Sequence, residues 1–116
     1  MKITTIDIPI YFGYFRIVVT KNFKKAVKKL NIDTKGMNVK NYGAFADNDT
    51  TDEGYFRYTV LLPPKPSHSL IAHEAVYLVN SLFINVGITP CRINDEPQAY
   101  LTGWFVGEVY KALKRN

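Results

Sequence analysis

The apolar run over residues 70–83 is the feature that most constrains how this chain folds. Prolines at positions 63, 64 and 66 precede it, and proline ends a strand because it cannot donate to the ladder of hydrogen bonds. We therefore expect a helix that begins near residues 67–69 and ends at about Val86, with Gly87 as its C′ residue. Apolar residues cover much of its circumference, so this helix should lie at the centre of the domain.

Two strand pairs and a short helix are expected before this central helix. β-branched and aromatic residues mark one pair at residues 3–8 and 14–19, and a second at residues 41–47 and 55–62. Between the pairs, apolar residues at helical spacing predict an amphipathic helix over residues 23–30, with Asn22 as its N-cap.

A second long helix should begin after Asn94 or Asp95, because Pro97 is tolerated in a first helical turn. Together these elements predict an α+β fold, in which a small strand layer with one short helix packs on two long C-terminal helices. A length of 116 residues suits one hydrophobic core, so residues 1–116 are expected to form a single domain.

Composition favours a folded protein of a reducing compartment. Hydrophobic residues make up 47% of the chain, which is ordinary for a globular domain and argues against disorder. Cys91 is the single cysteine, so neither an internal disulfide nor a C-x-x-C metal site can form. Asp7 and Pro9 interrupt the N-terminal apolar residues, and no later run is expected to reach membrane-spanning length. The sequence thus predicts a cytoplasmic protein without a membrane segment.

The central helix carries the sequence H-E-A-V-Y at His73, Glu74 and Tyr77. In the zinc-binding H-E-x-x-H arrangement, two histidines one turn apart hold the metal and the glutamate activates the bound water. Positions 73 and 77 lie about 40° apart around a helix, so Tyr77 points where the second imidazole would be. A histidine and a glutamate on so apolar a helix need partners, since an unpaired buried charge is costly.

Downstream, the sequence E-P-Q-A-Y places Glu96 nineteen residues after Tyr77 and Tyr100 one turn further. With H-E-A-V-Y, this pattern resembles the small, minimal gluzincin-like domains found in phages and prophages, over residues 55–114. The resemblance implies that His73 and Glu96 are metal ligands, that Tyr77 replaces the second histidine, that Glu74 is the catalytic base, and that Tyr100 lines the pocket. Two strong ligands and a neutral phenol are too few for tight binding, so zinc is not expected to be held tightly.

Positive charge is concentrated in the first third of the chain. Residues 1–40 hold nine Lys and Arg against two Asp, whereas residues 41–116 hold six Lys and Arg against eight Asp and Glu. The outer face of the short helix is formed by lysines, at Lys24, Lys25, Lys28 and Lys29. This face is either solvated or, with the nearby Tyr14 and Arg16, a site for an anion with a flat ring.

These observations predict a catalytically degenerate zincin-like protein that binds and sequesters a small anionic, nucleotide-like ligand or a host protein. If it is phage-encoded, as the resemblance implies, it would act in the host cytoplasm, for instance against a host defence. Nucleic acid is a less expected partner, because no known nucleic-acid module is recognised. The alternatives are an active zinc metallopeptidase and a module that forms homo-oligomers through the face of residues 99–113 that bears Gly103 and Gly107.

Overall fold

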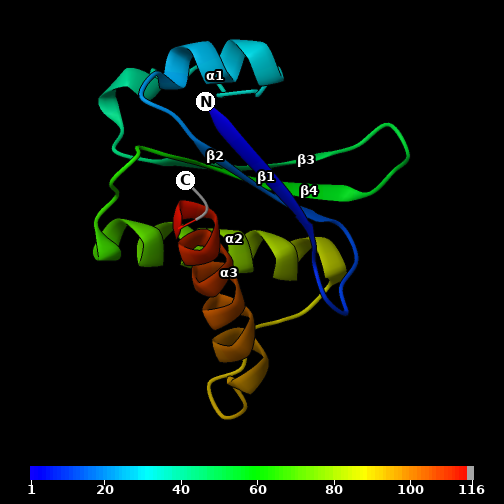
Figure 1. Ribbon diagram of the computed structural model, residues 1–116. Helices are drawn as coiled ribbons and strands as arrows, with labels where there is room; N and C mark the ends of the chain where they lie inside the picture. Colours follow the sequence, from blue (N-terminus) through cyan, green and yellow to red (C-terminus); the bar gives the residue numbers. More distant parts are fainter. Residues whose placement is uncertain (115–116) are drawn as a thin grey trace.

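A four-stranded sheet separates one short helix from two long ones (Figure 1). The computed structural model describes residues 1–114, except the side chain of Asn41. In chain order the elements are β1 (Lys2–Asp7), β2 (Tyr14–Val19), α1 (Phe23–Leu30), the 3₁₀ helix η1 (Val39–Asn41), β3 (Phe45–Thr50), β4 (Phe56–Leu62), α2 (His68–Val86) and α3 (Glu96–Lys114). The predicted α+β class, with two long C-terminal helices, is confirmed.

The strand order is β1-β2-β4-β3, with a parallel pair at the centre. β1 pairs with β2 and β3 pairs with β4 in antiparallel fashion, whereas β2 and β4 run parallel, with Phe15 opposite Tyr58 and Ile17 opposite Val60. Parallel neighbours cannot be joined by a tight turn, so the chain between them must cross over, and it does so through α1 and β3. The sequence predicted the two strand pairs β1–β2 and β3–β4. The structure adds that the two pairs are joined into one sheet by the parallel pairing of β2 with β4.

Alternate residues of the central strands enter two cores on opposite faces. On one face, Phe15, Ile17 and Val60 pack with the buried sides of α2 and α3. On the other face, Val18 and Leu61 pack with Ala26 of α1 and with the segment that follows it. Because both faces are covered, β2 and β4 are almost wholly buried, as expected for parallel strands.

The boundaries of α2 follow the local signals in the sequence. Ser67 is the N-cap, and its hydroxyl accepts a hydrogen bond from the Leu70 N–H at 3.2 Å. Gly87 closes the helix at a φ of 77°, where a residue without a side chain is favoured. The predicted start near residues 67–69 and the predicted end at Val86 are both confirmed.

By length and composition alone, α2 is also long and apolar enough to cross a membrane, which corrects the expectation that no run reaches that length. The core helix of a soluble protein passes the same test, and α2 buries seven side chains within the fold. The structure is therefore consistent with a soluble protein.

The third strand begins and ends later than the sequence predicted. The residues expected to start it, at 41–44, include the end of η1, and β3 runs instead from Phe45 to Thr50. The end of β3 next to the hairpin is stabilised by Asp49. This carboxylate accepts two hydrogen bonds from the Arg57 guanidinium directly opposite on β4, at 3.0 and 2.5 Å. This bidentate pair explains why a stretch with acidic residues is a strand, since opposite charges directly across a ladder are favourable.

Phe105 on α3 anchors the helical layer to the sheet, and its replacement tests this packing. Its side chain has no exposed surface, and its ring meets that of Phe15 edge-on with centroids 4.7 Å apart. We expect Phe105→Ala to lower the free energy of unfolding by about 3–5 kcal/mol, because it leaves a cavity in the core. Tyr100→Ala on the same helix is the control. The Tyr100 side chain is 77% exposed, so its loss should change stability by less than about 0.5 kcal/mol. Urea denaturation measures both, and equal effects would contradict this account of the core.

Candidate functional site

His73, Glu74 and Tyr77 lie together on α2, as their spacing predicted. His73 Nδ1 and Glu74 Oε1 are 3.1 Å apart, within hydrogen-bond distance. The His73 and Tyr77 rings meet edge-on with centroids 5.1 Å apart. The Glu74 side chain is largely buried, whereas those of His73 and Tyr77 are exposed. The glutamate thus has the partner that its burial requires.

A cavity of about 230 Å³ adjoins these three side chains. Its opposite wall comes from the segment between α1 and β4, and consists of Met37, Tyr42, Ala44, Phe45 and Ala46. Reasoning from the sequence missed this wall, because nothing local relates residues 37–46 to a helix that begins at residue 68. The one available signal was the aromatic and small-residue sequence Y-G-A-F-A, which was assigned to a strand.

Glu96 and Tyr100 do not line this cavity. His68 at the start of α2 contacts the hydroxyl of Tyr110 near the end of α3, whereas the start of α3 projects away from the sheet (Figure 1). Within residues 1–114, no three His, Cys, Asp and Glu side chains are grouped so that they could hold a metal ion. The predicted third ligand therefore does not join His73 and Glu74.

The donors beside the cavity do not fit a tightly bound zinc ion. Protein zinc sites use three or four strong ligands. Here His73 and Glu74 are already paired with each other, and the remaining neighbour is the neutral phenol of Tyr77, a poor zinc ligand.

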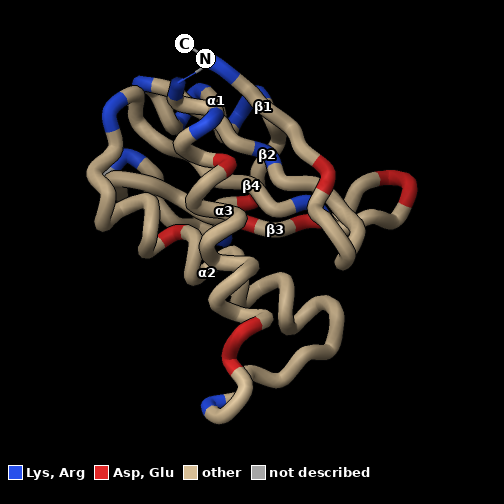
Figure 2. The backbone as a smooth tube through the Cα atoms, turned by 60° about the horizontal axis from the view of Figure 1, so that its bottom comes forward, with Lys and Arg blue, Asp and Glu red and all other residues tan. Residues whose placement is uncertain are grey.

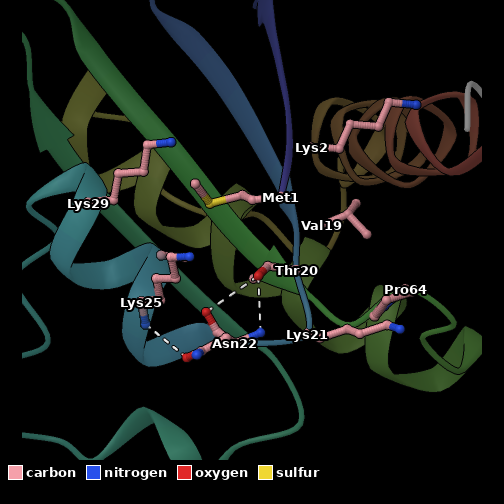
Figure 3. Close-up of a pocket in the computed structure, with 10 residues that line it drawn as sticks. Met1, Lys2, Val19, Thr20, Lys21, Asn22, Lys25, Lys29 and Pro64 are labelled. Atoms are coloured by element: carbon pink, nitrogen blue, oxygen red, sulfur yellow. Dashed lines mark hydrogen bonds between the residues drawn. The ribbon is translucent and has the colours of Figure 1, made fainter.

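The lysines of the first third of the chain line a larger cavity, of about 670 Å³ (Figure 3). Lys25 and Lys29 project from one side of α1, and Lys21 lies at the start of the turn into that helix. Lys2 lies at the far rim, where its ammonium group donates a hydrogen bond of 3.1 Å to the Ala112 carbonyl of α3. Figure 2 shows this gathering of basic residues around α1 and β1.

A second basic cavity, of about 510 Å³, lies on the other side of residues 20–22. Lys21, Lys24 and Lys40 line it, together with the ring of Tyr42. Pro63 and Pro64, which follow β4, reach one cavity each, so both cavities lie beyond the carboxyl ends of the parallel strands. Among the residues that the structure describes, neither lining includes an Asp or a Glu.

Hydrogen bonds hold the segment that separates the two basic cavities. The Thr20 hydroxyl accepts a hydrogen bond from the Asn22 N–H at 3.1 Å. The Asn22 side chain caps α1 by accepting a hydrogen bond from the Lys25 N–H at 3.0 Å, as the sequence predicted. The first turn of α1 contains no acidic residue, so its positive end is not neutralised from within.

The structure separates the other residues that the sequence assigned to an anion site. Lys28 lines neither basic cavity. Tyr14 lies at the opposite end of β2, about 17 Å of strand away from Val19, with its ring against Tyr55. The Arg16 side chain is buried on β2 and donates from Nε to the Thr59 hydroxyl at 3.0 Å.

The pKa of Arg16 reflects the same burial. Loss of solvent lowers its pKa most, and the nearby Arg57 lowers it further, whereas Asp49 and Asp47 act in the opposite direction. Arg16 therefore belongs to a charged network on the sheet and not to the lysine-lined cavities.

The glycine-bearing face predicted to form oligomers is open. Gly103 and Gly107 are exposed on α3, and a Cβ atom built on either would meet no described atom within 4 Å beyond its chain neighbours and the adjacent helix backbone. Such a surface permits the close approach of another helix. Oligomer formation itself stays a prediction.

No family model, curated protein or solved structure matches this chain. The resemblance to minimal gluzincins therefore rests on the sequence motifs alone and stays a prediction.

We expect the purified protein to retain much less than one equivalent of zinc after dialysis against a chelator, because its donors are too few. Elemental analysis by mass spectrometry measures this directly. The His73→Ala variant is the control, since zinc held at this site would disappear with the imidazole. One equivalent that survives dialysis in the native chain and is lost in His73→Ala would overturn this assignment.

Proposed function

We propose that this protein functions by binding a small anionic, nucleotide-like ligand in the lysine-lined cavities beside α1, and not by zinc-dependent hydrolysis. One observation carries the proposal. The cavity of about 670 Å³ is lined by Lys2, Lys21, Lys25 and Lys29, and by no acidic residue of the described chain. Its volume falls in the range of about 300–1,000 Å³ that is typical of small-molecule sites.

Electrostatic interactions favour the binding of an anion in the lysine-lined cavity of about 670 Å³. Several ammonium groups around one cavity repel each other, and a bound anion replaces that repulsion with attraction. The positive end of the α1 dipole adds to the attraction, because the first turn of α1 carries no acidic residue. The position also suits a ligand, since open α/β sheets bind ligands beyond the carboxyl ends of parallel strands.

The nucleotide-like character of the ligand is supported by an aromatic ring in the adjoining cavity. Tyr42 is partly exposed and lines that cavity with Lys24 and Lys40. A flat heterocycle can stack on an exposed tyrosine while its phosphate meets the lysines. Tyr42 therefore takes the role that the sequence suggested for Tyr14.

The biological role in this proposal is sequestration. A phage-encoded chain of this kind would hold a nucleotide-derived signal in the host cytoplasm and so counter a defence that depends on it. The motif resemblance supports this setting. Duplex nucleic acid is a weaker candidate than a small ligand, because the lysines surround cavities and do not form an extended stripe.

The test compares two lysines of the same helix. Lys25 lines the large cavity and Lys28 lines neither cavity, yet both are exposed lysines of α1. Lys25→Glu should weaken nucleotide binding by about tenfold, which corresponds to about 1.4 kcal/mol. Lys28→Glu makes the same change in net charge and should weaken binding less than about threefold. Calorimetry against pyrophosphate and a panel of linear and cyclic nucleotides measures both, with circular dichroism to verify folding.

Ionic strength provides a second readout of the same experiment. Affinity for the native chain should fall as salt rises, because exposed charges are screened over about 10 Å at 0.1 M salt. Equal losses in the two variants would show that overall charge, and not the cavity, attracts the ligand. Absence of binding by every member of the panel at low salt would refute the proposal.

A further inference from the structure

The cavity beside α2 has a chemistry opposite to that of the lysine-lined cavities. Glu74 carries the one carboxyl group among its described lining residues, and no Lys or Arg lines it. In a chain with a formal net charge of +5, a cavity lined by a carboxylate and by no Lys or Arg is an exception that charge composition does not explain.

Glu74 is buried, but only one of its two carboxylate oxygens has a hydrogen-bond partner. The residue is 7% exposed, and its Oε1 atom pairs with His73 Nδ1. Its second oxygen, Oε2, makes no hydrogen bond within residues 1–114. Every fully buried side-chain polar atom of the described chain has a hydrogen-bond partner. Because Oε2 has none, it is not fully buried and retains some accessible surface. A largely desolvated carboxylate with one free oxygen can gain much from a cation that reaches it.

Two tyrosines and a thioether line the cavity together with His73 and small residues. Tyr77 projects from α2, and Tyr42 lies in the opposite wall. The Phe45 ring packs in the core on the α1 face of the sheet, against the Tyr42 ring, with 6.5 Å between centroids. Met37 completes this apolar wall. Aromatic faces attract cations, and methylated ammonium groups in particular are bound by rings placed around a carboxylate.

We infer that this cavity binds an organic cation of about the size of a trimethylammonium group. Its volume of about 230 Å³ lies below that of most drug-sized sites, and suits the head of a side chain or a small amine. The group can belong to a free amine such as choline or to a methylated lysine side chain, which share this chemistry. The inference does not rest on the anion proposal, because Glu74 and Tyr77 line neither lysine-lined cavity, although Tyr42 is shared with the smaller of those cavities.

Charge and shape can be separated with a pair of ligands. Choline and 3,3-dimethylbutan-1-ol have nearly the same shape, but only choline is charged. Calorimetry or NMR titration should show saturable binding of choline and at least about tenfold weaker binding of the neutral alcohol. Nα-acetyl-trimethyllysine amide forms the second arm, and tighter binding than choline would identify a protein side chain as the source. Equal binding of choline and the alcohol, or no binding of either cation, would overturn the inference.

Variants locate the binding. Glu74→Gln keeps the shape of the side chain and removes its charge, and should weaken choline binding at least about tenfold. Glu108→Gln is the matched control, because Glu108 is a partly buried glutamate of α3 that lies outside this cavity. Should Glu74→Gln fail to fold, Tyr77→Ala provides the same test. It is expected to fold, because Tyr77 is 57% exposed and outside the core. Tyr77→Ala should weaken choline binding several-fold and Tyr77→Phe, which keeps the ring, should not.

Lys25→Glu distinguishes the two sites. It should leave choline binding unchanged, whereas it should weaken nucleotide binding. If choline binding survives both Glu74→Gln and Tyr77→Ala, the cation binds elsewhere and the inference is wrong. Absence of nucleotide binding by the native chain, with choline binding retained, would refute the anion proposal and leave the cation site intact.

Discussion

The parallel pairing of β2 with β4 is the constraint on which the other features of this structure depend. It requires a crossover connection, and α1 within that connection covers one face of the sheet while α2 and α3 cover the other. It also brings the turn after β2 and the prolines after β4 to the same edge. The basic cavities form at that edge, so their position follows from strand direction.

Residues 37–46 connect the two candidate sites physically. Tyr42 contributes to the lysine-lined cavity of about 510 Å³ and also to the cavity beside Glu74. One side of this segment thus faces ammonium groups and the other faces a carboxylate. Charges of opposite sign are kept in separate cavities, so each can attract its own class of ligand without being neutralised by the other.

The helix with H-E-A-V-Y shows how little a motif decides when its partners are missing. Helical geometry brings His73, Glu74 and Tyr77 together whatever the rest of the chain does. A metal centre needs further donors that converge from other elements, and the direction in which α3 packs on α2 takes Glu96 away from them. What remains is a buried carboxylate with aromatic neighbours, which is better suited to an organic cation than to zinc.

The sequence by itself determined the features that depend on neighbours within a few residues. Ser67, Gly87 and Asn22 set helix ends through local hydrogen bonds, and the apolar character of residues 70–83 predicted that α2 is a central helix. Only the tertiary structure decided that β2 and β4 are parallel, and that Lys25 lines a cavity while Lys28 does not. It also decided that residues 37–46 face Glu74. These features depend on how distant elements pack against a shared core, and periodicity within one segment carries no information about its distant neighbours.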